Sequence, residues 1–301
     1  MQIVRKVIVK GEEISIFDHL KREHDHALRS GIYKKARFHG SFGDFCFLKG
    51  CGLSIEKATV YNYDKLIFGI GYLKNLKILS IEFPNKDIFT YDIFPKLKML
   101  EAPWVRDEQG ISALSHLSII DLRLDHVPKH IDPIQNGIIE DMTLYAPKIE
   151  DLKVISGFSV LDSLRIEKAR TLKTLHGLPQ SLTSLLIGYT KSIADYSRLI
   201  DLPGLKILAI TKSLENQDLP NSIYSIPHLE HLGVSMGPVS VNWNKLLEMP
   251  KLNSMAFHLS SPPPSREILD QIARENGKIV NEMKVTGVKK RPVVTIKLDS
   301  L

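Results

Sequence analysis

The most regular feature of this chain is a short pattern of apolar residues that returns at nearly constant intervals. The pattern reads apolar-x-x-apolar-x-apolar, and its copies start 20 to 24 residues apart between residues 33 and 252. Clear copies start at Leu76, Leu97, Leu117, Leu161, Leu182, Leu205 and Leu229, and weaker copies at Tyr33, Ile55, Ile139 and Leu252. Side chains of a strand alternate between its two faces, so each copy predicts a short strand whose apolar positions one, four and six point into a core.

The segments between the copies carry a second regularity. An apolar anchor often stands three residues before a copy, with or without a proline after it. Both parts are present in Phe94-Pro95, Leu202-Pro203, Ile226-Pro227 and Met249-Pro250. Proline blocks helix continuation and favours extended backbone before it, so each turn enters its strand from a fixed direction. A further copy at Ile149 lies only 12 residues before Leu161. That is too short for a full turn, and we assign the extra copy to the connecting side.

Repeated copies of this length and pattern resemble the leucine-rich-repeat family over roughly residues 33–260. The resemblance implies an α/β solenoid, a horseshoe with a parallel β-sheet on its concave face and short helices or loops on its convex face. One strand with one apolar face cannot bury itself, but stacked turns share a continuous core. The family motif also places Asn or Cys three positions after the last apolar residue of each strand. Here that ladder is missing, and residues such as Thr190 and Ser213 stand there instead, so the subclass and the regularity of the curve stay open.

The ends of the array are expected to be caps, because a solenoid must cover its first and last apolar layers. We divide the chain into an N-terminal cap at 1–32, about eleven repeats at 33–260 and a C-terminal cap at 261–301. In the first cap, residues 3–9 and 14–17 alternate apolar and polar positions and predict a hairpin, followed by a short helix.

The C-terminal cap is expected to contain a helix and closing strands. Ser265 is a suitable N-cap, and Gly277 a suitable stop for the helix. Val280-x-x-Met283-x-Val285 fits a final degenerate repeat, and residues 293–296 predict a closing edge strand. The basic run Lys289-Lys290-Arg291 between them is best interpreted as a charged guard of an exposed edge.

The residues available for binding are those at positions three, five and seven of each copy, which point away from the core. These positions are mixed in charge, and the centre of the array adds Arg and Tyr side chains, with Trp and Tyr at strand exits. Such residue types often dominate the binding energy at protein interfaces. The alternative is that they are only the solvated face of a sheet. The predicted partner-binding residues are Glu82, Glu101, Trp104, Asp121, Arg123, Asp141, Tyr145, Arg165, Glu167 and Tyr189.

The composition is typical of a soluble globular protein. Hydrophobic residues make up 43% and charged residues 25% of the 301, and the formal charge is +6. We find no signal-peptide pattern and no run of apolar residues long enough to cross a membrane. The two cysteines, Cys46 and Cys51, lie in an apolar stretch and are best interpreted as buried thiols rather than a disulfide. A cytoplasmic protein is expected.

Candidate chemistry is sparse. His19, His24 and His26 stand close together but lack the spacing of a helical zinc motif. Gly69-Ile70-Gly71 lacks the third glycine of a nucleotide-binding loop, and neither cysteine lies in a catalytic signature. We therefore expect no enzyme, no metal and no cofactor.

The expected function is to hold a partner protein on the concave sheet. The chain resembles stand-alone bacterial repeat proteins, among which immunity or antitoxin-type inhibitors are one known use. The alternative is an adaptor or effector that recruits a substrate to an enzyme on another chain. Nucleic-acid binding ranks behind both, because the basic residues gather at the two ends and the centre is mixed in sign. Neither a membrane nor a small molecule is expected as the partner.

Overall fold

The chain forms two compact units in the computed structural model. Unit 1 comprises Met1–Val127 and Ile134–Met142, and unit 2 comprises Pro128–Pro133 and Thr143–Leu301. The structure describes residues 8–17, 28–39, 48–50, 52–61, 70–81, 96–103, 121–125, 135–136, 139–214, 217–288 and 291–300. Some residues on which predictions were placed lie outside the described ones: Cys46, Cys51, His19, His24, His26, Gly69, Glu82, Phe94, Pro95, Trp104, Leu117, Lys289 and Lys290.

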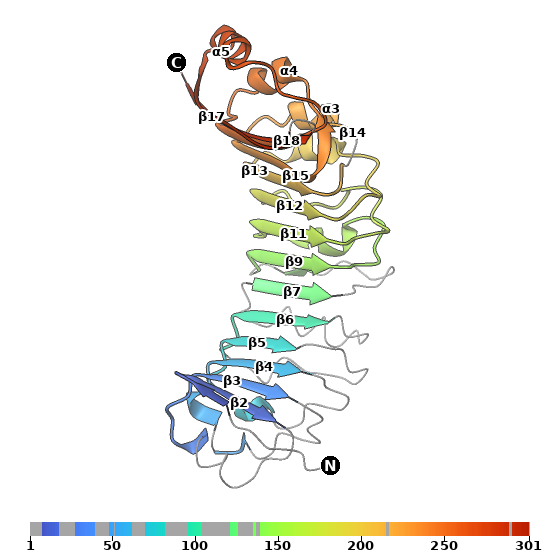
Figure 1. Ribbon diagram of the computed structural model, residues 1–301. Helices are drawn as coiled ribbons and strands as arrows, with labels where there is room; N and C mark the ends of the chain where they lie inside the picture. The colour runs from blue at the N-terminus through green and yellow to red at the C-terminus, as the bar shows by residue number, and fades with distance from the viewer. Residues whose placement is uncertain are drawn as a thin grey trace, which may run out of the picture. The chain divides into compact units, whose positions relative to one another are not determined.

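Unit 1 is built on parallel strands that follow one another in chain order (Figure 1). A hairpin of β1 (Ile8–Lys10) and β2 (Glu13–Phe17) begins it, with Val9 opposite Ile14. The parallel neighbours of β2 are then β3 (Lys35–His39), β4 (Lys57–Tyr61), β5 (Ile78–Ile81), β6 (Met99–Pro103) and β7 (Asp121–Asp125). The parallel series therefore starts one strand before residue 33, inside the segment expected to be a cap.

The register of these strands follows the repeat template. Position four aligns Ala36, Ala58, Leu79 and Leu100 across β3 to β6, and each is at most 2% exposed. Ile14 of β2 adds to the same row and is fully buried. Equivalent apolar residues of successive turns thus lie in one shared layer, as the spacing predicts.

The copy that starts at Leu117 predicts a strand at positions three to seven, residues 119–123, and this prediction is wrong by two residues. The structure places β7 at Asp121–Asp125 and aligns Leu122, not Ile120, with Leu100. Both registers fit the apolar template, but the observed one alternates charged and apolar residues throughout and buries Leu124. Because the shift is by two, it does not exchange inward and outward positions of the strand, and Arg123 is exposed.

Unit 2 continues the one-strand-per-turn plan. β9 (Asp141–Tyr145) contains the boundary between the units, and β11 (Ser163–Glu167), β12 (Ser184–Gly188), β13 (Ile207–Thr211), β15 (His231–Ser240) and β16 (Ser254–Leu259) follow. From β11 to β16 these strands pair in parallel and align Leu164, Leu185, Leu208, Leu232 and Met255, all at most 2% exposed.

The described connections between the strands are made of short elements. They contain the 3-10 helices η2 (Gly52–Ser54), η3 (Ile70–Tyr72), η5 (Lys153–Ile155) and η6 (Ser197–Asp201), the helices α3 (Asn221–Tyr224) and α4 (Trp243–Glu248), and the short strands β8 (Gln135–Asn136), β10 (Gly157–Phe158) and β14 (Gln217–Asp218). The extra copy at Ile149 lies on this side, where Leu152 and Val154 are buried around η5.

One connection of unit 2 depends on a glycine. Gly177 has a φ of +97°, and a Cβ on it would lie 2.4 Å from the backbone carbonyl carbon of Leu152. In this close approach, the Leu152 amide donates to the carbonyl of His176. Only glycine fits both the dihedral angle and the contact. By contrast, Gly233 in β15 has open space where its Cβ would be.

The C-terminal end closes the sheet of unit 2 with antiparallel strands. α5 (Arg266–Glu275) is capped by the Ser265 side chain and followed by Gly277 at a φ of +68°, as expected. β18 (Arg291–Ser300) pairs antiparallel with both β16 and β17 (Lys278–Val288). Two expectations are therefore wrong: residues 280–285 are not a degenerate repeat, and the edge strand is β17 rather than the segment 293–296. A direct hairpin lets β18 cover the last parallel strand and leaves β17 outside it.

The surroundings of two charged residues of β17 lower the pKa of each. Lys278 is buried, its ammonium donates to the carbonyl of Met249 after α4, and burial lowers its pKa. Glu282 lies between Lys284 and Lys297, at 2.5 and 2.6 Å, and hydrogen bonds from these two ammonium groups lower its pKa to about 2. The charges around Glu282 lie on an edge strand, where charged side chains oppose pairing with a strand of another chain.

Candidate functional site

The exposed face of each unit, defined as the side chains at positions three, five and seven of its strands, is the candidate binding surface. In β11 the positions alternate strictly: Leu164 and Ile166 are buried, whereas Ser163, Arg165 and Glu167 reach solvent. β3 and β9 show the same alternation. A partner that meets this face therefore contacts every second residue of each strand.

In unit 1 the structure brings together two of the predicted residues. Glu101 and Arg123 are both exposed and are register partners on β6 and β7. Glu101 also accepts a hydrogen bond of 3.1 Å from the Ser80 hydroxyl on β5. The strand position of Asp121 places it opposite Met99, and Asp141 is exposed at the start of β9. This part of the face joins opposite charges on neighbouring strands.

The basic start of unit 1 contains a paired arginine. Arg37 Nε lies 2.9 Å from Glu13 Oε1 on β2, so the arginine expected to be part of a basic end is neutralised by the preceding strand. His39 stacks on Tyr61 with ring centroids 4.5 Å apart. Its pKa is lowered by burial and by the charge of Arg37, which keeps the imidazole neutral near pH 7.

In unit 2 four predicted residues lie on consecutive strands or just after them. Arg165 Nε lies 2.7 Å from Glu167 Oε1 on the same strand. The ring of Tyr145 on β9 faces Lys168, whose ammonium lies 4.7 Å from the ring centroid and donates to the tyrosine hydroxyl. Tyr189, which is 38% exposed, follows β12 and donates from its hydroxyl to Met236 Sδ at 3.4 Å. The result is a cluster of aromatic and charged side chains at the end of three strands.

Beyond this cluster the exposed face of unit 2 becomes smooth. The position-five row reads Arg165, Leu186, Ala209, Gly233 and Ala256 from β11 to β16. Beside it Ile207 is 43% exposed. Small side chains leave the sheet backbone close to the surface, so a partner can approach it along this row while charged and aromatic groups flank one end.

Position eight of five turns of unit 2, those of β9, β11, β12, β13 and β15, has a conformation that the template does not predict. Ala146, Lys168, Tyr189, Lys212 and Met236 all have φ between 46° and 58°. Position eight would point into the core if the strand continued, but the left-handed backbone turns it outward. The amides of the first four donate to the position-seven carbonyls of the next strand, at 2.7–2.9 Å, so the backbone hydrogen bonding runs on past the strand ends.

Position nine replaces the missing asparagine ladder with hydroxyl groups. Thr190 and Ser213 are 0% and 2% exposed. Thr190 Oγ1 accepts from the Ala169 amide at 3.3 Å and donates to the Gly188 carbonyl at 3.0 Å. Ser213 Oγ likewise accepts from the Thr190 amide at 3.0 Å and donates to the Thr211 carbonyl at 3.1 Å. These bonds satisfy buried amides that lack a strand partner.

Among the described residues, no three His, Cys, Asp or Glu side chains are grouped as a metal would require. Within that same part of the chain, none of the helices combines the length and apolarity needed to span a bilayer.

One short strand per turn, shared apolar rows, an open and mostly parallel sheet and few helices define a leucine-rich-repeat-like fold. No protein-family model and no curated protein matches the chain. A solved structure of a leucine-rich-repeat protein from Leptospira interrogans is similar, with 17% identity and a TM-score of 0.37, over 81% of this chain and 77% of that one.

Proposed function

We propose that this protein is a non-catalytic binding module that holds a partner protein on its exposed sheet face. The observation that carries the proposal is the arrangement in unit 2, where Tyr145 and Arg165 stand beside the smooth row from Leu186 to Ala256. Tyr and Arg are frequent energetic anchors of protein interfaces, and a shallow row next to them gives a partner backbone room to lie close.

The charge pattern also favours a protein over a nucleic acid. A nucleic-acid surface would present an unbroken row of cations toward the phosphates. On the exposed face the cations alternate with carboxylates instead: Arg165 is paired with Glu167, and Arg123 is the register partner of Glu101. Exposed pairs of this kind contribute only about 0–1 kcal/mol to stability, so they are available to exchange partners on binding.

A finer proposal concerns the biological role. We propose a cytoplasmic inhibitor of the immunity or antitoxin type, which binds one toxin in a fixed ratio. The adaptor or effector alternative predicts several partners instead. The neighbouring genes and the stoichiometry of the captured complex distinguish the two, because an immunity protein is expected beside its toxin and binds it one to one.

A charge-reversal series tests whether the partner binds to the exposed face. Glu101→Arg, Arg123→Glu and Arg165→Glu are compared with the unmodified protein in affinity capture, followed by titration of the captured protein. We expect at least one of these variants to weaken binding by about 2 kcal/mol, roughly thirtyfold. The matched control is Lys173→Glu, an exposed lysine of the connecting side that pairs with Glu150 at 3.0 Å. Unchanged affinity in all three face variants would exclude this surface.

A further inference from the structure

The strand entries of unit 1 are rich in lysine. An entry comprises the two residues before a copy of the repeat template and the first three residues of that copy. In the four copies of β3, β4, β5 and β6, the described entry residues hold seven lysines, all exposed, and one carboxylate, that of Glu56. Together with Glu56, the entry patch consists of Lys34, Lys35, Lys57, Lys74, Lys77, Lys96 and Lys98.

Stacking of the turns brings these lysines to one edge of the sheet. The second position of four consecutive copies is held by Lys34, Glu56, Lys77 and Lys98. In this row the amide of each of the last three donates to the carbonyl of the residue before it, at 2.8 Å. At the third position Lys35 and Lys57 are register partners on β3 and β4. The patch therefore runs over three strand spacings, roughly 14 Å.

The entry patch carries a surplus of positive charge whichever of its lysines are paired. Glu56 lies between two of them, with Lys77 Nζ at 2.9 Å from one carboxylate oxygen and Lys34 Nζ at 3.8 Å from the other. Lys96 donates to a side-chain amide oxygen at 2.7 Å, which removes no charge. The preceding turn adds two glutamates, one of which is paired with Arg37 at 2.9 Å. Lysines still outnumber the carboxylates, so the patch attracts anions.

Unit 2 shows that the repeat does not need lysine at these positions. At the third position of its copies, Ser163 and Ser184 are register partners on β11 and β12. At the second position, Lys206 pairs with Glu230 of the next turn at 3.2 Å. In unit 1, by contrast, the two lysines on β3 and β4 place like charges on neighbouring strands, which lowers stability. An arrangement that costs stability and that the core does not require indicates a role in binding.

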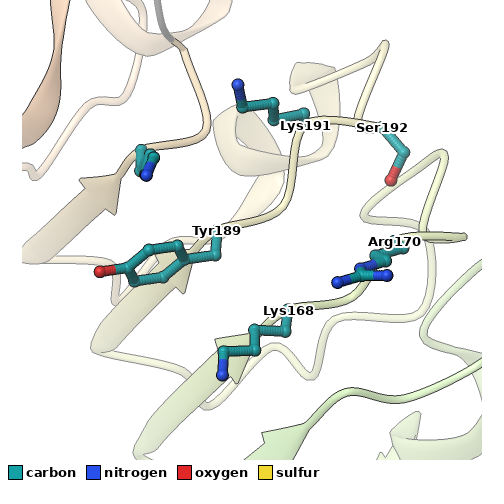
Figure 2. Close-up of a pocket in the computed structure, with 6 residues that line it drawn as sticks. Lys168, Arg170, Tyr189, Lys191 and Ser192 are labelled. Carbon is teal, nitrogen blue, oxygen red and sulfur yellow. The ribbon is translucent and has the colours of Figure 1, made fainter.

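Unit 2 also has lysines at the other end of its strands, where aromatic rings face them. Figure 2 shows the hollow of about 530 Å³ that Lys168, Tyr189 and other residues of these exits line. Lys168 Nζ lies 4.7 Å from the ring centroid of Tyr145, and Lys212 Nζ lies 5.6 Å from that of Tyr189. These two lysines contact aromatic rings of their own unit. The entry lysines of unit 1, in contrast, form an exposed row along one edge of the sheet.

We propose that the entry patch binds an acidic, extended segment of the partner protein. The inference rests on the proposed function, from which it takes that the partner is a protein. A row of exposed ammonium groups attracts carboxylates and raises the rate at which an acidic segment is encountered. The length of the patch, roughly 14 Å, corresponds to about four residues of extended chain.

A nucleic acid fits the entry patch less well for two reasons. Glu56 stands inside the second-position row, between Lys34 and Lys77, where its carboxylate would repel phosphates. All seven cations of the patch are lysines, whereas arginine is the residue that binds two phosphate oxygens at once. Lysine is a compact charge on a flexible stem, which suits the uneven spacing of carboxylates along a peptide.

Fluorescence anisotropy with the full chain tests this binding at low and at physiological ionic strength. The labelled probes are hexaglutamate, hexaglutamine and a deoxythymidylate hexamer. The variant Lys57→Glu with Lys98→Glu is expected to bind hexaglutamate at least about tenfold more weakly. The matched control, Lys173→Glu with Lys206→Glu, makes the same change in net charge on exposed lysines of unit 2. It should bind within about twofold of the unmodified protein, because salt screens distant charges.

A stability measurement separates loss of binding from loss of folding. Lys57→Glu places a carboxylate opposite Lys35, so this variant should melt at the same temperature as the unmodified protein or at a higher one. A lower melting temperature would contradict the like-charge argument. Circular dichroism checks the double variant, and Lys98→Glu alone carries the binding test if the double variant is not folded.

The binding data can overturn the inference in three ways. Hexaglutamate could bind no more tightly than hexaglutamine, or the double variant could bind hexaglutamate as tightly as the unmodified protein. Tighter binding of the oligonucleotide than of hexaglutamate at equal ionic strength would indicate a nucleic-acid ligand instead.

Failure of the entry patch is distinguishable from failure of the exposed face. If Arg165→Glu weakens capture of the partner but hexaglutamate does not bind, the entry patch is refuted and the proposed function stands. If the lysine variants weaken hexaglutamate binding while Glu101→Arg, Arg123→Glu and Arg165→Glu all keep full affinity for the captured protein, the exposed face is refuted and the entry patch stands.

Discussion

The hydroxyl ladder at position nine allows a sharp test of what holds the turns of unit 2 together. Thr190→Val keeps the shape of a fully buried side chain and removes its hydroxyl. The Gly188 carbonyl keeps another donor, the Lys168 amide at 2.9 Å, so it stays satisfied. The Ala169 amide, in contrast, loses the oxygen to which it donates at 3.3 Å.

The magnitude follows from that one unsatisfied amide. Leaving a buried donor without an acceptor costs about 1–3 kcal/mol, so we expect Thr190→Val to lower the free energy of unfolding by that amount. Chemical denaturation with urea measures it, and faster hydrogen exchange at the Ala169 amide locates it. The control is Thr183→Val, which removes a partly exposed hydroxyl that donates to Asp162 Oδ1 at 2.6 Å. We expect a change below about 0.5 kcal/mol there, because water replaces the lost bond.

Equal stability of the Thr190→Val and unmodified proteins would refute the role of the ladder. A second variant, Ser213→Ala, removes the acceptor of the Thr190 amide at 3.0 Å. Because the two hydroxyls are linked through residue 190, the double variant should deviate from the sum of the single effects. Strict additivity would mean that the two rungs act independently.

Three further predictions concern stability. Gly177→Ala should lower the melting temperature severely or prevent folding, since it strains the backbone and meets a carbonyl carbon at 2.4 Å, while Gly233→Ala should change stability by only about 0.5 kcal/mol. Because the pKa of Lys278 is lowered in the folded protein, the unfolded chain holds more protons than the folded chain at pH values between that lowered pKa and 10.5. Stability should therefore rise with pH in that window, and Lys278→Met should remove this rise; identical pH profiles would contradict the burial argument. Glu282, with its pKa lowered to about 2, should contribute stability above pH 4.5 that is lost as pH falls toward 2, and an acid titration of Glu282→Gln should lack that loss.

Alternation of side chains along a strand was enough to predict the position of some residues of the candidate site but not of others. Tyr145, Arg165 and Glu167 could be placed on the exposed face because the apolar residues between them had to point inward. Lys168 and Lys212 could not be placed, since strand alternation sends position eight into the core. The recurrence of Lys168, Tyr189 and Lys212 at that position was the available signal, because such side chains are seldom buried.

The amino-acid sequence by itself determined the period of the repeat, the identity of the buried rows and the outward side of each strand, because these follow from local alternation and the need to bury aliphatic side chains. Only the tertiary structure decided the register of β7 and the antiparallel closure by β18, since more than one pairing satisfied the same apolar pattern. It also decided the left-handed strand exits and the hydroxyl ladder, which depend on hydrogen bonds to residues one full turn away. Lys168, Tyr189 and Lys212 are some twenty positions apart along the chain, and they line one hollow only because the turns stack.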